Sequence, residues 1–524
     1  MKQTMPAVRI DNRGVKVPSG TTILEAAQRL GIEIPTLCHM ESIDRFTSCM
    51  VCLVQESVTG RFLPSCSAPV TDGMVIETNT EAVREARRNI LELLLREHVG
   101  DCESPCTRAC PLYLDIPVML GKIARDMSGR VRSTQLTPIP LFRTIEYICP
   151  APCERACRRG SYDEPVSIRL ALQAAAEYRI TGDTSEALTV SHSSGKKVAV
   201  VGAGPAGLSA AYHLRLLGHD CTIFDDQDEP GGSLRTQIPK ERLPRPVLDH
   251  EINRIRELGV IFLMNRSLGK DVDLRDLRRR FDAIVITTGI ATPVIAGSPG
   301  IRRTEQGIQI NRETFETSLE GIFAGGSAVR PCRIAARSVA NGRSVAFGVH
   351  RYLGECEADV PGKRFDLHMG TLRDGEMDAF LQGASRSPRI HPSGENEYGF
   401  TREEAARESA RCLHCDCGKK DACLLRTYAH EYGATGHRYR VQERTRYERI
   451  LEHPHILYEP SKCIKCGRCV RLTEQRNEHY GLYFKGRSYS VCVAVPFGET
   501  LAQGLEKSAL ECAEACPTGA LVAR

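Results

Sequence analysis

Alternating hydrophobic and polar residues open the chain. The runs AVRID and GVKVPSG alternate with period two, which predicts two short strands. The next segment, TTILEAAQRLG, changes to helical spacing and predicts a helix whose apolar positions are Ile23, Ala26, Ala27 and Leu30. Residues 81–102 predict a longer amphipathic helix with Val83, Ala86, Ile90, Leu93 and Leu94 on one side.

A strand, turn and helix pattern follows at residues 196–225. The segment KKVAVVGAGPAGLSAAYHLRLLGHDCTIFD predicts a buried strand, a glycine-rich turn, a helix and a second strand that ends at Asp225. The chain thus passes from an α+β pattern to an α/β pattern. With 524 residues, of which 41% are hydrophobic, it is long enough for three to five domains.

Charge and cysteine usage narrow the function classes. The net charge of +5 comes from 70 basic and 65 acidic residues, too balanced for a nucleic-acid-binding protein. No signal peptide or membrane-spanning segment is apparent, so we expect a cytoplasmic protein without a membrane partner. The 23 cysteines stand in tight groups, which favours metal sites in a reducing compartment over disulfides.

The first cysteine group has gaps of ten, two and thirteen residues. Four thiolates with a single CxxC suit a [2Fe-2S] cluster, and a structural zinc site is the alternative. This stretch resembles the β-grasp ferredoxin domain of the large iron–sulfur subunit of NADH dehydrogenase and of related hydrogenases. The expected ligands are Cys38, Cys49, Cys52 and Cys66.

A second group follows the long helix. His98-x3-Cys102 resembles the one-His [4Fe-4S] site of the same NADH dehydrogenase family. Beyond it, the spacing resembles the helical domain of the glutamate synthase small subunit and dihydropyrimidine dehydrogenase, which implies two interleaved [4Fe-4S] clusters. Carried over by position, one cluster takes Cys110, Cys149, Cys153 and Gln173, and the other takes Cys102, Cys106 and Cys157 with His98 in place of a missing cysteine. As alternatives, His98 is a helix cap and Gln173 faces solvent.

The glycine-rich turn is a dinucleotide fingerprint, because a strand precedes it, a helix follows it and Asp225 stands about 20 residues on. The fingerprint alone fits both FAD and NAD. Downstream segments (PGGSLRTQIPKERLP, FDAIVITTG, GIFAGGSAV) resemble the FAD domain of glutamate synthase small subunits, which implies FAD. The implied contacts are Gly202, Gly204, Pro205, Ala206, Gly207, Asp225, Gly232, Arg235, Gly289, Gly326 and Ser327.

The chain departs from that family at two places. Ser327 replaces an aspartate, which weakens an expected ribityl contact. Only residues 290–320 stand where the family has a complete NAD(P)H-binding domain, and this segment is too short for a domain of βαβ units. We therefore expect the nicotinamide site to be missing.

Two cysteine groups lie in the last quarter of the chain. Cys412, Cys415, Cys417 and Cys423 predict a further [4Fe-4S] cluster, with zinc as the alternative. The C-terminal segment resembles a bacterial two-cluster ferredoxin, whose crossover rule assigns one cluster to Cys463, Cys466, Cys469 and Cys516. Thr473, Glu506 and Ala509 replace three ligands of the second cluster, so we expect only one, with Cys512 a buried apolar residue.

These expectations amount to a multidomain α+β and α/β protein with one [2Fe-2S] cluster, four [4Fe-4S] clusters and FAD. The expected domains are a β-grasp ferredoxin domain (1–80), a helical double-cluster domain (81–190), a Rossmann-like FAD domain (191–355), a linker with a cysteine-rich motif (356–455) and a ferredoxin-like domain (456–524).

No nucleophile and base pair, molybdenum or nickel ligand set, or hydride-donor site is apparent in the sequence. We therefore expect an electron-relay subunit of a cytoplasmic NAD-linked complex that resembles the electron-bifurcating hydrogenases. The expected partners are NADH- and FMN-binding iron–sulfur subunits and a hydrogenase or formate dehydrogenase catalytic subunit, with ferredoxin as a further candidate. The alternatives are a transhydrogenase subunit, a self-contained NAD(P)H oxidoreductase of the glutamate synthase small-subunit type, and a zinc-binding scaffold.

Overall fold

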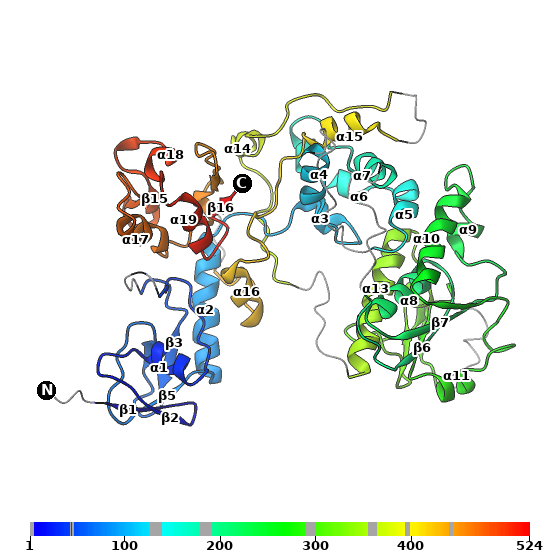
Figure 1. Ribbon diagram of the computed structural model, residues 1–524, viewed down its shortest axis with the longest axis horizontal. Helices are drawn as coiled ribbons and strands as arrows, with labels where there is room; N and C mark the ends of the chain where they lie inside the picture. The colour runs from blue at the N-terminus through cyan, green and yellow to red at the C-terminus, as the bar shows by residue number, and fades with distance from the viewer. Residues whose placement is uncertain are drawn as a thin grey trace. The chain divides into compact units, whose positions relative to one another are not determined.

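The computed structural model describes residues 5–41, 43, 47–125, 139–178, 190–289, 300–354, 364–393, 399–439 and 444–524. The chain divides into two compact units, each formed by segments that are far apart in the sequence (Figure 1). Unit 1 consists of Met1–Ser104, Arg364–Ala384 and Leu413–Arg524, and unit 2 consists of Pro105–Lys363 and Ser385–Cys412.

Unit 1 begins with the expected β-grasp domain. Its mixed sheet has the order β2-β1-β5-β3-β4, with the central pair β1 and β5 parallel. A capping box starts the helix α1, since the Glu25 amide donates to Thr22 Oγ1 and the Thr22 amide donates to the Glu25 carboxylate. The elements are β1 (Ala7–Ile10), β2 (Arg13–Lys16), α1 (Ile23–Arg29), β3 (Leu53–Glu56), β4 (Phe62–Pro64) and β5 (Met74–Glu77).

The long helix α2 (Glu81–Glu97) forms as expected, and its buried side matches the predicted one in part. Val83 is buried, and Ile90 and Leu94 are partly buried against the core, as predicted. Leu93 is 48% exposed, so its predicted place was wrong, and Leu91 and Leu95 are buried instead. Arg87 is also buried, where it donates to the Leu53 carbonyl and to the Tyr432 hydroxyl, and such a residue looks polar in the sequence.

The C-terminal part of unit 1 has a ferredoxin-like arrangement in which the antiparallel pair β13 and β16 packs with α19, and α19 packs against α17. One apolar core of these elements contains Ile456, Leu472, Leu505 and Cys512. The elements are α14 (Glu376–Leu381), α16 (Leu424–Glu431), β13 (Ile456–Tyr458), α17 (Arg468–Gln475), β14 (Tyr483–Lys485), β15 (Cys492–Ala494), α18 (Leu501–Gly504), α19 (Ala509–Ala515) and β16 (Leu521–Ala523).

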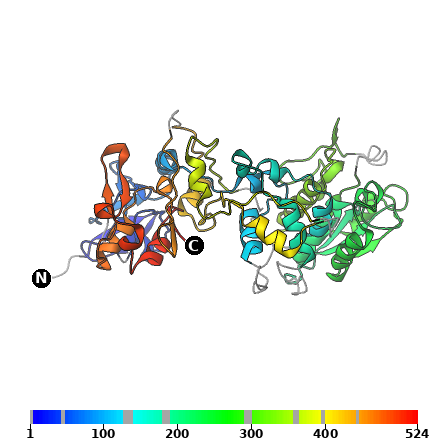
Figure 2. The same ribbon diagram turned by 90° about the horizontal axis from the view of Figure 1, so that it is seen from above.

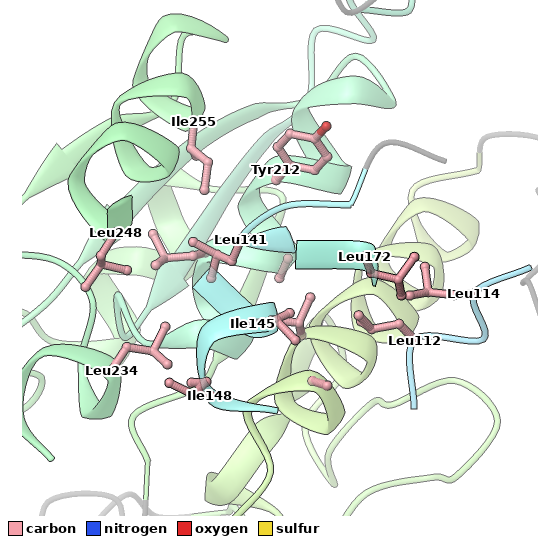
Figure 3. Close-up of a cluster of buried hydrophobic side chains, with 14 of the residues drawn as sticks. Leu112, Leu114, Leu141, Ile145, Ile148, Leu172, Tyr212, Leu234, Leu248 and Ile255 are labelled. Atoms are coloured by element: carbon pink, nitrogen blue, oxygen red, sulfur yellow. The ribbon is translucent and has the colours of Figure 1, made fainter. Parts of the chain in front are cut away.

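Unit 2 contains a cluster of short helices. The helix α15, far downstream in the sequence, packs against α4 and α7 (Figure 1, and from above in Figure 2). These helices share one hydrophobic core with the sheet that follows, and Figure 3 shows Ile145 and Ile148 within it. The helices are α3 (Pro105–Ala109), α4 (Ile116–Arg125), α5 (Phe142–Ile148), α6 (Pro152–Arg155), α7 (Ile168–Glu177) and α15 (Arg402–Ser409).

The second part of unit 2 is a Rossmann-like domain with the parallel sheet order β12-β9-β6-β7-β8. Both faces of the sheet are buried, with Val198 and Val200 in one core and Ala199 and Val201 in another. The strands are β6 (Lys197–Val201), β7 (Asp220–Phe224), β8 (Ile261–Leu263), β9 (Ala283–Ile286) and β12 (Ile322–Ala324), and the helices are α8 (Pro205–Leu216), α9 (Ser233–Thr236), α10 (Arg245–Glu257), α11 (Leu274–Arg280) and α13 (Ala335–Tyr352).

The connection from β9 to β12 is short. Residues 290–299 lie outside the described residues, and residues 300–320 hold only the two-stranded hairpin of β10 (Arg303–Thr304) and β11 (Gly307–Ile308) as regular structure. Elsewhere in the described chain, every helix is too short or too polar to cross a bilayer.

Candidate metal centres and nucleotide cavity

The four N-terminal cysteines converge in the β-grasp domain. All four are buried, and the Cys38 thiol contacts those of Cys49 and Cys66, while Cys52 contacts Cys66. The Thr47 hydroxyl lies 3.9 Å from the Cys66 sulfur. This donor set and its burial fit a [2Fe-2S] cluster, as the spacing predicts.

Unit 1 brings Cys102 close to the two cysteines Cys417 and Cys423, although the spacing had placed them in separate groups. The Cys417 amide donates to the Cys102 carbonyl at 3.1 Å. Burial and then the negative charge of Cys417 raise the pKa of Cys102 to about 12 and that of Cys423 to about 11. Backbone amides also reach two of the sulfurs, from Leu367 to Cys102 and from Arg426 to Cys423, both at 3.5 Å.

His98 stands at the end of α2, four residues before Cys102. Its side chain is only 9% exposed, and burial lowers the imidazole pKa to about 4, so the ring is neutral at pH 7. The ring hydrogen-bonds to the backbone of Lys462, while Nδ1 is buried without a hydrogen-bond partner among the described residues. Metals bind a neutral imidazole in which one ring nitrogen makes a hydrogen bond and the other is available to the metal. His98 is buried in this form, so the alternative of a solvated helix cap is wrong.

The C-terminal ferredoxin-like domain supplies one cavity with four thiols. Cys463, Cys466, Cys469 and Cys516 line it together with Tyr458. Cys512 is not among the lining residues but lies fully buried in the apolar core, with its sulfur 3.9 Å from the Cys469 carbonyl. The structure thus groups the four cysteines that the crossover rule selects.

Thr473 has a structural role in the same domain. Its hydroxyl donates to the Val470 carbonyl at 2.8 Å and accepts from the Leu482 amide at 3.1 Å. Ala509 lies in the core, and Glu506 is exposed. Protein core therefore occupies two of the three positions that would need the missing thiolates, those of Thr473 and Ala509.

We expect Thr473→Val to destabilise the protein by about 1–3 kcal/mol, because the buried Leu482 amide would lose its acceptor. Iron content should stay at the wild-type level. Denaturant unfolding and iron analysis of the same preparations check both parts, and a loss of iron with unchanged stability would contradict this role for Thr473.

Two groups of cysteines lie in unit 2. Cys110, Cys149 and Cys153 line one cavity, together with Glu146 and Arg169. The other predicted cysteine ligands of this unit are Cys106 and Cys412, both in the same buried core, and Cys157, which packs against that core.

Gln173 is buried on α7, but it does not line the cavity of the three cysteines. Its Oε1 accepts a hydrogen bond from Arg169 Nη1 at 3.4 Å, and its side chain also hydrogen-bonds to that of Tyr147. The solvent-facing alternative for Gln173 is therefore wrong, and its polar atoms already have protein partners.

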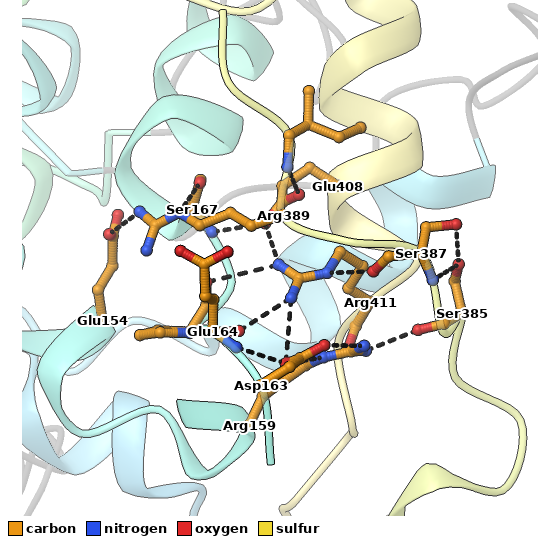
Figure 4. Close-up of polar contacts among 12 residues, drawn as sticks. Glu154, Arg159, Asp163, Glu164, Ser167, Ser385, Ser387, Arg389, Glu408 and Arg411 are labelled. Atoms are coloured by element: carbon orange, nitrogen blue, oxygen red, sulfur yellow. Dashed lines mark hydrogen bonds and ion pairs between the residues drawn. The ribbon is translucent and has the colours of Figure 1, made fainter. Parts of the chain in front are cut away.

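A buried arginine pair fixes the segment that ends at Cys412 (Figure 4). Arg411 forms ion pairs with Glu408 at 2.7 Å and with Asp163 at 3.2 Å. Arg159, two residues after Cys157, pairs with Asp163 and donates to the Arg411 carbonyl at 2.7 Å. Because both guanidinium groups are fully buried and paired, the backbone next to Cys412 is held against the loop that follows Cys157.

Not all expected partners share a unit. Cys106 and Cys157 belong to unit 2, and Cys102 and His98 belong to unit 1. Cys412 belongs to unit 2, whereas Cys415, Cys417 and Cys423 belong to unit 1, where Cys415 lies beside Arg449.

Two cavities are lined by thiols, one by Cys110, Cys149 and Cys153 and the other by Cys463, Cys466, Cys469 and Cys516. A cubane places iron and sulfide between its ligands, so a cavity between thiols suits such a cluster.

The glycine-rich turn opens into a cavity of about 800 Å³, within the usual size range of cofactor sites. Asp225, at the end of β7, accepts hydrogen bonds from the Ala203 and Gln227 amides. Ser327 Oγ accepts from the Cys332 amide at 3.3 Å. The expected residues that line the cavity are Gly202, Gly204, Pro205, Ala206, Asp225, Gly232, Gly289 and Ser327.

Three expected contacts do not line this cavity. Gly207 allows close packing instead, since a Cβ there would stand 1.8 Å from the Gly202 carbonyl oxygen. Arg235 pairs with Asp249 and Glu229. The amide of Gly326 donates to the Asn341 side chain. These residues shape the surroundings of the site.

The nucleotide cavity and the cavity of the three cysteines share a wall. Ile145, Cys149 and Ala336 line both. Ile145 comes from α5 and Ala336 from α13, which also pack against each other, and Figure 3 shows Ile145 in their common core. The sequence alone could not reveal this contact, because the two helices are far apart along the chain.

Comparison with protein families supports the division of the chain into iron–sulfur domains and a Rossmann-like domain. Residues 3–81 match the 2Fe-2S iron–sulfur cluster binding domain, and residues 72–182 match dihydropyrimidine dehydrogenase domain II, 4Fe-4S cluster. Residues 200–259 match the NAD(P)-binding Rossmann-like domain. The expected fold class and the two kinds of iron–sulfur domain are therefore confirmed.

Similar proteins are subunits of oxidoreductases. The chain is 32% identical over 311 residues to NADP(+)-dependent formate dehydrogenase subunit beta of Moorella thermoacetica, covering 53% of this chain and 42% of that protein. It is 29% identical to NADPH-Fe(3+) oxidoreductase subunit beta of Geobacter sulfurreducens, covering 57% and 47%. It is 31% identical to the glutamate synthase [NADPH] small chain of Bacillus subtilis, covering 35% and 37%.

The chain spans less than half the length of each of these relatives. The matched parts nevertheless agree in kind with the resemblance drawn from the motifs. The chain is therefore an iron–sulfur protein with a Rossmann-like nucleotide-binding domain, related to oxidoreductase subunits.

Proposed function

We propose that this chain is an electron-relay iron–sulfur flavoprotein subunit of a cytoplasmic NAD-linked oxidoreductase complex. The observation that carries the proposal is the wall shared by the nucleotide cavity and the three-cysteine cavity. Electron transfer requires proximity of carriers, and this wall includes Cys149 itself. The Rossmann-like sheet positions the nucleotide side of the wall, and α5 positions the cluster side.

FAD fits the nucleotide cavity in size and in donor set. The glycine-rich turn lets a pyrophosphate approach the N-terminus of α8, and Asp225 suits a ribose hydroxyl. Bound flavin would supply the exchange between two-electron and one-electron chemistry. The residues Ile145 and Ile148 give the cavity an apolar lining on the side of the three-cysteine cavity.

We further propose a new grouping of the ligands. His98, Cys102, Cys417 and Cys423, all in unit 1, would hold one [4Fe-4S] cluster. In unit 2, Cys106, Cys157 and Cys412 belong to a second cluster, and Cys110, Cys149 and Cys153 belong to a third. Cys463, Cys466, Cys469 and Cys516 hold the fourth, and Cys38, Cys49, Cys52 and Cys66 hold the [2Fe-2S] cluster.

For the complex, we propose an electron-bifurcating hydrogenase, with NADH- and FMN-binding iron–sulfur subunits as partners. A formate dehydrogenase complex is the second candidate, favoured by the similarity to the Moorella thermoacetica subunit. Purification of the native complex under anaerobic conditions, followed by metal analysis, separates the two. Nickel would support a nickel–iron hydrogenase, and molybdenum or tungsten would support the formate dehydrogenase.

The full chain, purified anaerobically, should contain about 18 irons and one FAD, the content of one two-iron and four four-iron clusters. Iron, sulfide and flavin analysis measure this directly. A folded preparation that binds zinc instead of iron, or that takes up no flavin, would contradict the proposed role as an electron-relay flavoprotein.

NADPH or NADH alone should leave the flavin of the isolated chain oxidised, because the described connection between β9 and β12 holds only a short hairpin. Dithionite should bleach it in the same cuvette and serves as the positive control. Rapid bleaching by stoichiometric NADPH would instead support a self-contained oxidoreductase of the glutamate synthase small-subunit type.

A further inference from the structure

A buried carboxylate belongs to the cavity of the three cysteines in unit 2. Glu146 lies on α5, one helical turn before Cys149, and it lines the cavity with Cys110, Cys149 and Cys153. Its side chain is 4% exposed. Three thiols and one carboxylate, from three segments of the chain, therefore surround the same space.

The carboxylate of Glu146 has little compensation from the protein. Among the described residues, no donor makes a hydrogen bond to it. The nearby cation is Arg169, whose Nη1 donates instead to the Glu146 backbone carbonyl at 3.2 Å and to Gln173 Oε1 at 3.4 Å. A buried carboxylate is costly unless it is paired, protonated or bound to a metal, so this position calls for a partner that the protein itself does not supply.

The electrostatics agree with this placement. Burial raises the pKa of the Glu146 carboxyl group to about 8. Its charged form would act on Cys110, Cys149 and Cys153, so the carboxyl group lies near every sulfur of the set. A cluster in the cavity would bring iron, whose positive charge offsets both the thiolates and the carboxylate.

Gln173 is the competing fourth ligand. It occupies the position that the resemblance to the helical iron–sulfur domain implies, but its side chain is outside the cavity lining and hydrogen-bonds to Arg169 and Tyr147. Its recruitment would require these contacts to break. Glu146 already lines the cavity.

We propose that a carboxylate oxygen of Glu146 is the fourth ligand of the [4Fe-4S] cluster held by Cys110, Cys149 and Cys153. This inference rests on the proposed function, because it assumes that a cluster occupies this cavity. Gln173 then has no part in binding the cluster, and its side chain hydrogen-bonds to Arg169 and Tyr147.

The test compares Glu146→Ala, Glu146→Cys and Gln173→Leu in the full chain, reconstituted with iron and sulfide under anaerobic conditions. Glu146→Ala should lose about one iron per chain and show the EPR signal of a three-iron cluster, because one corner loses its ligand. Glu146→Cys should keep all the iron at a lower potential, since a thiolate donates more charge than a carboxylate. Gln173→Leu should keep the wild-type iron content and EPR signals.

Three results would overturn the assignment, and the first two concern Glu146→Ala and Gln173→Leu. One is a Glu146→Ala protein with wild-type iron content, EPR signals and potentials. The other is the appearance of the three-iron signal in Gln173→Leu. Retained iron and an unshifted potential in Glu146→Cys would count against it in the same way, and this variant stays informative if alanine prevents folding.

The double variant Cys110→Ala, Cys153→Ala separates this inference from the proposed function. If the cavity holds a cluster, two corners lose their ligands and the protein should lose about four irons whatever the fourth ligand is. If the double variant keeps all the iron, the cavity binds no cluster, and the relay through the shared wall fails together with the inference.

Discussion

Cys417→Ser should remove the same four irons as Cys102→Ser, and the double variant should lose no more than either single variant. The two residues are remote in the sequence, but the Cys417 amide donates to the Cys102 carbonyl at 3.1 Å. If both sulfurs hold one cubane, either serine disrupts the whole cluster, because an oxygen ligand replaces a soft thiolate. Iron analysis of the two single variants and the double variant measures the non-additivity directly.

Cys106→Ser is the matched control for this cycle. Cys106 lies only four residues from Cys102 in the sequence but belongs to unit 2. The pair Cys102→Ser and Cys106→Ser should therefore lose about eight irons together, the content of two cubanes. The opposite result would contradict this grouping. If the iron losses of Cys102→Ser and Cys417→Ser add, and those of Cys102→Ser and Cys106→Ser do not, then Cys102 shares its cluster with Cys106, as the sequence spacing predicts.

Two substitutions of His98 test whether this residue is a ligand of the same cluster. His98→Cys should keep the cluster and lower its potential, because imidazole ligation raises the potential in Rieske centres. His98→Ala should lose or destabilise it. If both variants keep the wild-type iron content and potential, the unpartnered Nδ1 of His98 has no ligand role.

Local patterns predicted the elements that depend on neighbouring residues. The helix α1, the glycine-rich turn before α8 and the parallel strand β7, which ends one residue before Asp225, all involve residues close in sequence, and all formed as expected. The N-terminal cysteines also converge, because one small sheet positions all four. The crossover rule links the distant Cys516 to Cys463, Cys466 and Cys469, and these four cysteines line one cavity, while their role as cluster ligands stays a prediction.

Cysteines that a long insertion separates along the chain could not be grouped from their spacing. Unit 2 interrupts unit 1 directly after Ser104, so Cys102 and Cys417 flank a whole module. Spacing rules count residues along the chain, and they therefore joined Cys102 to Cys106, and Cys417 to Cys412. The contact between Cys417 and Cys102 depends on how the chain re-enters unit 1, which no local pattern records.

Glu146 escaped notice for a different reason. A glutamate within a short helix is usually solvated, and nothing in TIEYICP marks it as buried. Its burial depends on packing around α5 by segments distant in the sequence, including α7 and α10. Charged residues that tertiary packing buries beside cysteines are therefore the ligands that sequence reading is least able to find.

Cys466→Ser should remove about four irons, whereas Cys512→Ser should remove none. Both residues are buried cysteines of the same small domain, which makes them a matched pair. They differ in surroundings, since Cys466 lines the cavity with Cys463, Cys469 and Cys516, and Cys512 packs among apolar side chains. A cubane with three thiolates left loses its attachment at one corner, but an apolar core tolerates a small polar substitution at a cost of only a few kcal/mol.

The measurement is iron and sulfide content of the full chain, with the EPR spectrum of the reduced protein and its thermal unfolding recorded on the same samples. In Cys512→Ser, the melting temperature should fall because a buried hydroxyl replaces the sulfur, while the iron content stays at the wild-type level. In Cys466→Ser, the signal of one reduced cluster should disappear. A loss of iron in Cys512→Ser equal to that in Cys466→Ser would mean that Cys512 is a ligand, and that a second cluster survives beside Thr473 despite the missing thiolates at positions 506 and 509.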